Sequence, residues 1–307
     1  MTNTVLASSA LMVQHMAYNM DFFKVQNVPK LYLFSKHLQF LDVDDMALQA
    51  KNMGFDGVDL TVRKKGHASP ENVIQELPNA IASLKKYHLL ADSITTEVSD
   101  PNLSLHRQVL ETAASLDIKL YRMDWLPYVE NIDITSSITL RQKQLRDLSR
   151  LNQKLKITGM YQNHSGLKMG ASVWELNQML QGAKHEFMGV QYDIRHATVE
   201  GGMSWESGLR LVSPQIKSIV LKDFKWREKE DGSWEIENVP IGKGMVDFKA
   251  FFKMIKASKI DVPFILHFEY PLGGAEHGAR EITMDSNKIY DYMKRDMNKV
   301  KELWQNS

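Results

Sequence analysis

The sequence predicts a single closed (β/α)₈ barrel, and three observations support this class. Eight segments of strand length alternate along the chain with segments of helical spacing. The chain has 307 residues, a length that one such barrel accommodates. An open doubly wound sheet is the alternative, but it requires a glycine-rich phosphate turn after the first strand. The residues at that place are Phe34-Ser35-Lys36-His37.

The elements can be placed in order from residue 30 onward. Strands are predicted at residues 31–35, 57–62, 91–98, 119–125, 157–164, 189–194, 218–223 and 264–270. Helical spacing predicts helices at residues 43–53, 70–87, 104–116, 138–155, 172–183 and 248–258. Strands that alternate with helices form a parallel sheet, and eight such units favour closure into a barrel. Residues 227–237 are polar and contain Asp231-Gly232, so we expect a long loop there that folds out as a hairpin.

Composition excludes several classes of protein. Apolar residues make up 43% and charged residues 24% of the chain, which is typical of a globular domain with its own core. The net charge of +1 predicts no nucleic-acid partner and no attraction to an anionic membrane. Since there is no Cys, disulfides, thiolate nucleophiles and Cys-ligated zinc are excluded. No run of about 20 apolar residues occurs, so we predict no membrane span.

The first 29 residues are predicted to be an N-terminal extension, with the barrel domain at residues 30–307. Residues 5–13 are mildly apolar, but the run is short and no Lys or Arg precedes it. A signal peptide has a basic start and a longer apolar run. We therefore expect a cytoplasmic protein, with a periplasmic one as the alternative if a signal has been trimmed. The sequence leaves a homo-oligomer open.

Polar side chains recur on one face of the predicted strands. Successive side chains of a strand point to opposite faces, so residues two apart share a face. In the order of the strands, these sets are Asp59, Thr61 and Arg63; Ser93, Thr95 and Glu97; Arg122 and Asp124; Gln162 and His164; Gln191 and Asp193; Val220 and Lys222; and Ile265, His267 and Glu269. In a barrel the apolar face meets the helices, so these sets point inward.

The polar residues also gather toward the C-terminal ends of the strands. Barrel enzymes bind and transform their substrates at that end. A mouth lined by Asp, Glu, His, Lys and Arg suits a small ligand rich in hydroxyl groups. A small-molecule carbohydrate is therefore the predicted partner.

Several motifs resemble those of one superfamily over roughly residues 30–300. They are Gln162-Asn163-His164, Asp193-Ile194-Arg195-His196, Leu221-Lys222-Asp223, Glu269, the stretch from Gly54 to Asp59, and the stretches from Val239 to Gly244 and from Val246 to Phe248. On these motifs the chain resembles the xylose isomerase-like barrels, the sugar phosphate isomerase/epimerase family. The resemblance implies a sugar isomerase or epimerase that removes a proton beside a carbonyl.

The resemblance also implies a divalent metal such as Mn, Mg or Zn, and no organic cofactor. In that superfamily the metal is usually held by a Glu, an Asp, a His and a Glu on the last four strands. Asp193 and Glu269 match, Gln162 replaces the first Glu, and Val220 stands at the His position. The predicted ligand set is therefore the incomplete one of Asp193, Glu269 and Gln162.

The family's epimerases use two metal-bound carboxylates as acid and base, and Gln162 cannot serve as one. We therefore predict Glu269, His164 and His196 as the acid–base residues. Lys222 could polarise a carbonyl in place of a metal, or it could pair with Asp193 or Glu269. The predicted substrate-binding residues are Arg122, Gln162, Trp125, His267, Asp59 and Glu97. For Trp125, stacking on a sugar and packing in the core are both open.

Three further functions stay open. A lyase or hydratase acting on a keto-glycoside by β-elimination needs one base and one electrophile, which this site keeps. A carbohydrate-binding protein with a degenerate metal site would need neither. The DNA-repair endonucleases of the same barrel group use several zinc-binding histidines and a basic groove. The number of histidines on the inner face and the balanced net charge both argue against that branch.

Overall fold

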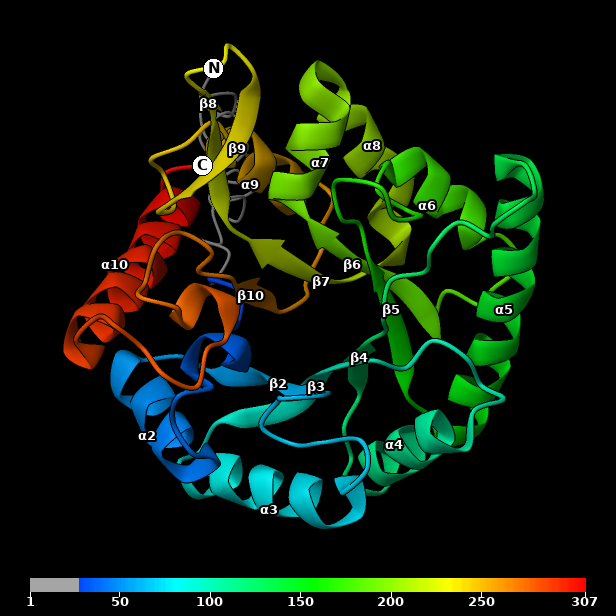
Figure 1. The fold of residues 1–307 in the computed structure, drawn as a ribbon, viewed down its shortest axis with the longest axis horizontal. Coiled ribbons are helices and arrows are strands. Elements are labelled where there is room, and N and C mark those ends of the chain that lie inside the picture. Colours follow the sequence, from blue (N-terminus) through cyan, green and yellow to red (C-terminus); the bar gives the residue numbers. More distant parts are fainter. Residues whose placement is uncertain (1–27) are drawn as a thin grey trace, which may run out of the picture.

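The computed structural model describes residues 28–307 and confirms the predicted barrel. All eight barrel strands are parallel, and the sheet closes in the order β1-β10-β7-β6-β5-β4-β3-β2 (Figure 1). The strands are β1 (Leu31–Phe34), β2 (Gly57–Val62), β3 (Leu90–Thr96), β4 (Leu120–Arg122), β5 (Thr158–Gln162), β6 (Met188–Asp193), β7 (Ile216–Leu221) and β10 (Phe264–Leu266).

The helices surround the strands as an outer ring (Figure 1). They are α2 (Val43–Met53), α3 (Val73–Lys86), α4 (Ser104–Ser115), α5 (Ile134–Leu155), α6 (Val173–Met179), α7 (Ile194–Gly201), α8 (Trp205–Val212), α9 (Phe248–Ala257) and α10 (Ser286–Gln305). Short 3₁₀ helices occur at η1 (Ser35–Leu38), η2 (Gly202–Ser204), η3 (Ser213–Gln215) and η4 (Ala275–His277). None of the helices within residues 28–307 is long and apolar enough to cross a membrane.

The outward faces of the strands form the main core with the helices. Tyr192 of β6 stacks on Phe251 of α9 with ring centroids 6.0 Å apart. Phe264 of β10 stacks on Phe252 of α9 at 5.8 Å and meets Trp304 of α10 edge-on at 5.6 Å. These contacts bury the apolar residues that the strand alternation assigned to the helix side.

The barrel interior contains a small apolar cluster beside its polar residues. Tyr32 and Phe34 of β1, Val220 of β7 and Ile265 of β10 form this second cluster, and each is at most 2% exposed. Since β1 and β7 both pair with β10, these side chains meet inside the barrel, beside the polar residues at its mouth. The Val220 position is thus a packing position, which explains its apolar side chain.

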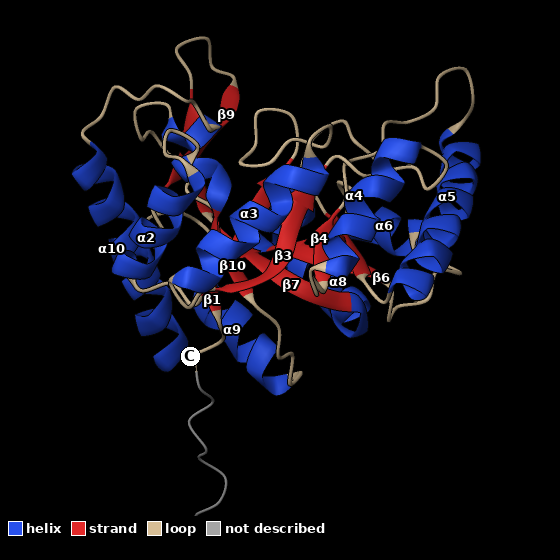
Figure 2. Cartoon of the chain, turned by 90° about the horizontal axis from the view of Figure 1, so that it is seen from below, coloured by secondary structure: helices blue, strands red, loops and turns tan. Residues whose placement is uncertain are grey.

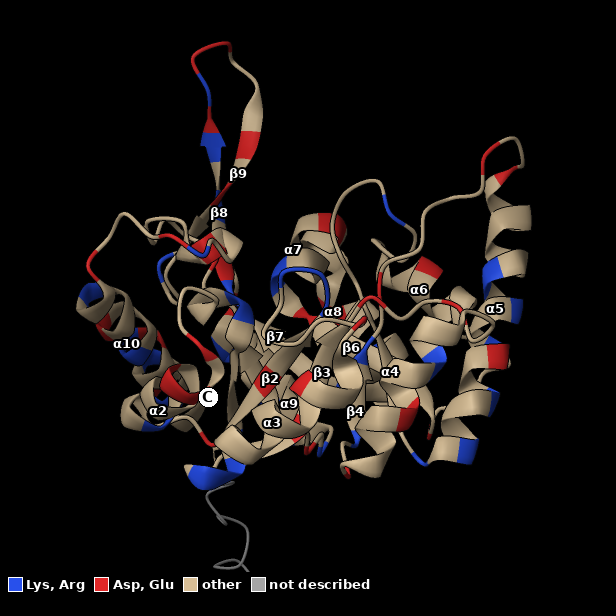
Figure 3. Ribbon diagram, turned by 60° about the horizontal axis from the view of Figure 1, so that its bottom comes forward, with Lys and Arg blue, Asp and Glu red and all other residues tan. Residues whose placement is uncertain are grey.

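The predicted hairpin is confirmed at residues after β7. It consists of β8 (Asp223–Glu228) and β9 (Trp234–Val239), which pair antiparallel. The hairpin rises on the side of the molecule where the loops that follow the barrel strands lie (Figure 2). Lys, Arg and Glu residues run along it, with Lys225 and Glu237 paired at 3.4 Å (Figure 3).

Several strands end earlier than predicted, β4 and β10 most of all, and the helices α7, α8 and α10 were not among those predicted. β4 ends at Arg122 and β10 at Leu266, so the remainder of the predicted segments 119–125 and 264–270 continues as loops that still point into the mouth. Helix α7 begins directly after Asp193, because that carboxylate accepts a hydrogen bond from the His196 backbone and caps the helix. The predicted boundary at residue 30 stays a prediction, since residues 1–27 lie outside the described residues.

Candidate active site

Lys222 stands at the centre of the polar residues in the barrel mouth. Its Nζ atom lies 3.0 Å from Glu269 Oε2, 3.2 Å from Asp193 Oδ2 and 2.8 Å from His196 Nε2. These partners come from the ends of β10 and β6 and from the first turn of α7, and Lys222 itself follows β7. The ion pairs that the sequence left open are therefore both present, and the side chain is only 3% exposed.

Asp193 is held rigidly from several directions. Its Oδ1 atom accepts from the His196 backbone at 3.0 Å, and its Oδ2 atom accepts from Gln162 Nε2 at 2.9 Å. The side chain of Asn163 binds both the backbone N–H and the backbone carbonyl of Asp193, at 2.8 and 3.0 Å. Burial raises the pKa of Asp193, and the charge of Lys222 opposes that shift. Asp193 thus orients Lys222.

Glu269 is the carboxylate at Lys222 that remains open to the mouth. Its side chain is 23% exposed, whereas that of Asp193 is fully buried. Burial alone would raise the pKa of Glu269, but Lys222 and His267 outweigh it and hold the pKa well below its usual value. Glu269 is therefore ionised at neutral pH and able to accept a proton from a ligand.

His267 lies beside Glu269, deeper in the barrel. Its Nδ1 atom is 3.6 Å from Glu269 Oε1, and its ring stacks on Phe34 with centroids 4.3 Å apart. Burial lowers the pKa of His267 to about 3, so the ring is neutral. Neither ring nitrogen has a hydrogen-bond partner within 3.5 Å among residues 28–307, and since Nδ1 lies near Glu269, Nε2 is the nitrogen without an acceptor or donor nearby.

The two other predicted histidines contact each other near Lys222, with their rings tilted by 37°. The ring centroids of His164 and His196 are 4.0 Å apart. Burial lowers the pKa of His164 to about 4 and that of His196 well below its usual value, so both are neutral. His196 is buried and contacts Lys222, whereas His164 is partly exposed and faces the mouth. Of the two, His164 is the one that a ligand can reach.

Arg122 and Gln162 connect the β4 side of the mouth to Asp193. Arg122 Nη1 donates to Gln162 Oε1 at 2.9 Å, while the amide nitrogen of Gln162 donates to Asp193. Trp125 lies next to them: its indole N–H donates to the Gln162 carbonyl at 3.1 Å, and its ring has Arg122 4.4 Å from the centroid. Trp125 is half-buried, so it packs on Arg122 and still borders the mouth.

The remaining two predicted binding residues lie near Arg63, away from Lys222. Asp59 is fully buried and accepts from Ser93 Oγ at 2.8 Å and Thr95 Oγ1 at 2.7 Å. Glu97 is half-buried and accepts from the Lys64 backbone at 3.1 Å. Asp59 thus joins β2 to β3 within the barrel, and its hydroxyl partners leave it no free approach to a ligand.

Two residues at the site were missed by the sequence reasoning. Arg195 is 5% exposed, and its Nη1 atom lies 2.9 Å from His196 Nδ1 while Nη2 donates to Asn238 Oδ1 at 2.7 Å. Lys36 follows β1, and the charges of Glu269 and Lys222 both influence its pKa. Neither lies on a predicted inward strand position, although Arg195 belongs to a motif that carried the family resemblance.

The residues present do not fit a divalent metal ion. Asp193 and Glu269 come together as predicted, but the Lys222 ammonium lies between them, where a metal ion would bind, and already balances part of their charge. The Gln162 oxygen, which a hard ion would require, accepts from Arg122 instead. Within residues 28–307 no three His, Asp or Glu side chains are grouped as a metal site.

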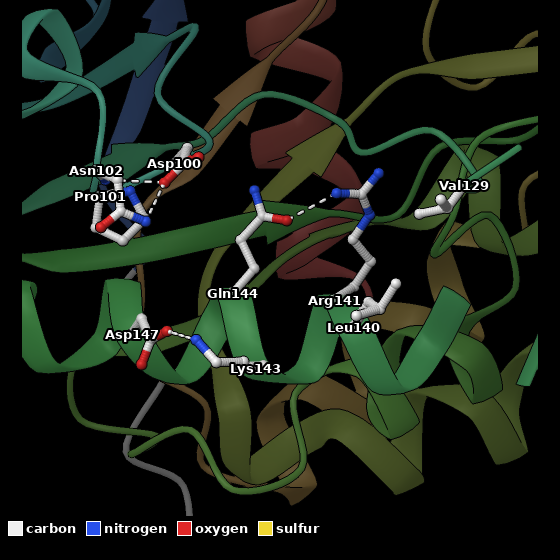
Figure 4. A pocket seen from close by; sticks show the side chains of 9 residues that line it. All are labelled: Asp100, Pro101, Asn102, Val129, Leu140, Arg141, Lys143, Gln144 and Asp147. Carbon is white, nitrogen blue, oxygen red and sulfur yellow. Dashed lines mark hydrogen bonds and ion pairs between the residues drawn. The ribbon is translucent and has the colours of Figure 1, made fainter. Parts of the chain in front are cut away.

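A separate hollow of about 280 Å³ lies outside the barrel mouth, between the loop after β3 and helix α5 (Figure 4). Its polar side chains bind one another: Arg141 donates to Gln144 at 2.8 Å and Lys143 to Asp147 at 2.7 Å. None of the predicted site residues lines it. It is a surface groove whose charged side chains mostly bind one another.

With the fold and the site described, the chain can be compared with known proteins. Residues 47–284 match the family model of the xylose isomerase-like TIM barrels, and the chain belongs to this family. No curated protein sequence matched the chain.

Solved structures share the fold at low sequence identity. A D-psicose 3-epimerase with D-tagatose from Clostridium cellulolyticum H10 has a TM-score of 0.68 and 10% identity, covering 90% of this chain and 99% of its own. A probable 3-DHS dehydratase from Bacillus anthracis has a TM-score of 0.62 and 14% identity, covering 89% and 98%. A xylose isomerase-like barrel protein from Mycobacterium smegmatis in complex with magnesium has a TM-score of 0.62 and 12% identity, covering 91% and 99%.

Proposed function

We propose that this protein is a sugar isomerase or epimerase that removes a proton from the carbon beside a carbonyl group. The observation that carries the proposal is the Lys222 ammonium, held between two carboxylates in the barrel mouth. A carbon acid of this kind needs a base for the proton and a positive charge for the oxygen on which negative charge develops. Glu269 is the proposed base and Lys222 the proposed source of positive charge.

The geometry supports these roles. Asp193 cannot leave Lys222, because it is buried and fixed by Gln162, Asn163 and the α7 backbone. Among residues 28–307, Glu269 has only Lys222 and His267 within ion-pair distance, and its side chain is partly open to the mouth. A substrate carbonyl oxygen that binds Lys222 would place the neighbouring carbon against Glu269. An enolate then forms beside an ammonium group in a site shielded from water, where charge stabilisation is strong.

The proposal assigns the positive charge to Lys222 rather than to a divalent ion. One similar structure contains magnesium, but the donor set of this chain already contains a cation at hydrogen-bond distance from the carboxylates. Every chemical step proposed for this site therefore uses side chains of the chain itself.

Epimerisation also requires a group that returns the proton to the other face of the carbon. His164 is the proposed partner, because it is partly exposed and its ring contacts that of His196, which binds Lys222. In this step His164 takes up a proton from water and delivers it to the enolate carbon, while Glu269 releases the abstracted proton to water, so that the protons balance. The similarity of the fold to that of a D-psicose 3-epimerase with D-tagatose agrees with an epimerase.

A lyase or hydratase is the second candidate. It is favoured by Gln162, because the amide removes the fifth-strand carboxylate and leaves Glu269 as the open carboxylate beside Lys222. β-Elimination needs only that one base and the electrophile. The similarity to a probable dehydratase agrees with this chemistry.

The test of the proposal is Glu269→Gln, which keeps the shape of the side chain and removes its charge. We expect turnover of keto-hexoses or 3-keto-glycosides to fall by about 10²–10⁴, the usual cost of losing a positioned base, while the variant stays folded. Glu206→Gln is the matched control, because Glu206 is a surface carboxylate on α8 whose side chain is 45% exposed. Wild-type turnover in Glu269→Gln would reject Glu269 as the base.

The reaction type is read from the same proteins in D₂O by NMR. An epimerase exchanges the proton beside the carbonyl and yields the other stereoisomer. A lyase exchanges it and releases water or an alcohol. A protein that binds the sugars without any exchange would be a carbohydrate-binding protein, and the enzymatic proposal would then be wrong.

A further inference from the structure

We propose that the substrate carries an anionic group, a carboxylate or a phosphate, which binds to Lys36, Arg63 and Arg122 at one side of the barrel mouth. This inference rests on the proposed function, since it names the substrate class of the same site. The observation behind it is that these three cationic side chains lie near one another and have no ion-pair partner within residues 28–307.

Arg122 is the buried member of this cationic cluster. It is 3% exposed, and its Nε atom has no hydrogen-bond partner within residues 28–307. Its guanidinium lies 4.4 Å from the centre of the Trp125 ring and 5.9 Å from that of Phe34. A buried N–H donor without a partner destabilises the fold, so its presence in a mouth indicates that a ligand supplies the acceptor.

Arg63 and Lys36 complete the cluster from two neighbouring strands. The Arg63 guanidinium lies 5.6 Å from the Phe34 ring centre, so the same ring brings Arg63 and Arg122 together. Lys36 lies two residues after Phe34, and β1 pairs with β2, which carries Arg63 at its end. Within residues 28–307 no carboxylate lies within 4.0 Å of any of these three cations.

The charges of the cluster act on one another. Burial lowers the pKa of Lys36 to about 8; Glu269 opposes the shift, and Lys222, Arg63 and Arg122 add to it. Burial also lowers the pKa of Arg122 to about 10, and Arg63 adds to that shift. Like charges gathered at partly buried positions repel one another, and an anion bound among them would relieve that repulsion.

The acidic groups nearby are engaged elsewhere. Asp59 accepts from the hydroxyl groups of Ser93 and Thr95, and burial raises its pKa. Asp124 accepts from the Trp125 backbone at 2.8 Å, and Glu97 from the Lys64 backbone. These carboxylates weaken the positive potential of the cationic cluster, but within residues 28–307 they form no ion pair with its members. A ligand oxygen anion can therefore use the free donors, and guanidinium groups bind carboxylate and phosphate through paired hydrogen bonds.

The cluster is joined to the reacting centre through one side chain. Gln162 accepts from Arg122 at 2.9 Å and donates to Asp193 at 2.9 Å, and Asp193 binds Lys222. Two residues, Gln162 and Asp193, thus connect an anion held by Arg122 to a carbonyl held by Lys222. A single sugar with its carbonyl near one end and its acidic group near the other matches this arrangement.

The test is binding of the full chain, measured by isothermal titration calorimetry. The probes are D-glucuronate and D-galacturonate for the carboxylate, D-glucose 6-phosphate for the phosphate, and D-glucose as the neutral match. We expect at least one anionic sugar to bind about tenfold or more tightly than glucose, as one charge-assisted hydrogen bond provides. We expect added NaCl to weaken that preference. Arg63→Gln and Lys36→Gln should each lose most of it, and Lys143→Gln, at an exposed ion pair on α5, should not.

The outcomes separate this proposal from the previous one. Preference for the uronates assigns a carboxylate, and preference for glucose 6-phosphate assigns a phosphate. Equal affinity for glucose and both kinds of anion would overturn the proposal, and so would an anion preference that survives both substitutions. Because binding needs no turnover, anion selectivity without any proton exchange would reject only the proposed reaction. Turnover of neutral sugars without anion selectivity would reject only the anion subsite.

Discussion

At the residue scale, the Lys222 side chain supplies the positive charge between the two carboxylates of the barrel mouth. Two buried or half-buried carboxylates facing each other repel, and a cation between them is required for both to stay ionised. Here the cation is covalently part of the chain and lies 3.0 and 3.2 Å from the two carboxylates. The neutral amide of Gln162 is consistent with this, because a third carboxylate would add negative charge that Lys222 could not balance.

Replacing Lys222 should expose the site to metal ions. In Lys222→Met, Asp193 and Glu269 lose their counter-charge, so we expect a loss of about 3–5 kcal/mol in the free energy of unfolding, as for other broken buried pairs. Added Mn²⁺ should raise the melting temperature of this variant by supplying the missing charge. The wild-type melting temperature should respond neither to Mn²⁺ nor to EDTA. A large Mn²⁺ effect on the wild type would contradict the assignment of the positive charge to Lys222.

At the scale of elements, one carboxylate organises the loop that follows the hairpin. Asp223 Oδ2 accepts from Gly242 and Gly244 at 2.9 and 2.8 Å, and Oδ1 accepts from Phe224 and Val246 at 2.9 and 3.2 Å. A side chain at Gly244 would collide with the Phe224 carbonyl and with Asp223 itself. In the Lys222-Asp223 motif, Asp223 thus stabilises the loop, while Lys222 is the residue proposed to take part in the reaction.

Asp223→Asn should loosen this loop. The new amide NH₂ would face two backbone N–H groups that now donate to an oxygen, and we expect a loss of about 1–3 kcal/mol in the free energy of unfolding. Hydrogen exchange should quicken at the amides of Gly242, Gly244 and Val246. Asp231→Asn, at the exposed tip of the hairpin, is the control and should leave those amides protected. Unchanged protection in Asp223→Asn would show that the glycine loop holds its shape without the carboxylate.

At the scale of the whole molecule, the last helix completes the ring of helices and brings a buried acid with it. Asp296 of α10 is 1% exposed, and its Oδ2 atom accepts from the Ile241 backbone at 3.4 Å. Burial raises its pKa from 3.8 to about 6, against the smaller opposing effects of its hydrogen bonds and of Arg295. The folded protein therefore holds this proton more tightly than the unfolded chain does.

This linkage makes stability depend on pH in a defined direction. At a pH below 3.8, the pKa in the unfolded chain, the raised pKa of Asp296 makes its full contribution to the stability of the folded state. This contribution to stability is lost as the pH rises through about 6. About two pKa units correspond to about 2–3 kcal/mol. Asp296→Asn should remove this component, so its stability relative to wild type should rise by about that amount from pH 4 to pH 7. Urea unfolding at several pH values measures it, with Asp291→Asn on the exposed face of α10 as the control. Parallel curves for Asp296→Asn and wild type would contradict the assignment.

Much of this architecture could be predicted because it depends on local periodicity. The alternation of apolar and polar residues within strands is a period-two signal, and it placed Asp193, Lys222, His267 and Glu269 on the inner face. The strand–helix alternation likewise determined the barrel class. Strand ends and helix starts were less certain, since a single cap such as Asp193 turns strand into helix within one residue.

The tertiary structure alone decided which charges meet. Lys222 could have polarised a ligand or paired with a carboxylate, and the register across β6, β7 and β10 brings it to both carboxylates at once. Arg122 lies 59 residues after Arg63 in the chain, and Arg63 lies 27 residues after Lys36. In the folded barrel all three cations lie on the side of the mouth where the Phe34 ring is near both guanidinium groups. Periodicity assigns a side chain to a face of its own strand. Distances between strands follow from barrel closure and register, which depend on every strand together.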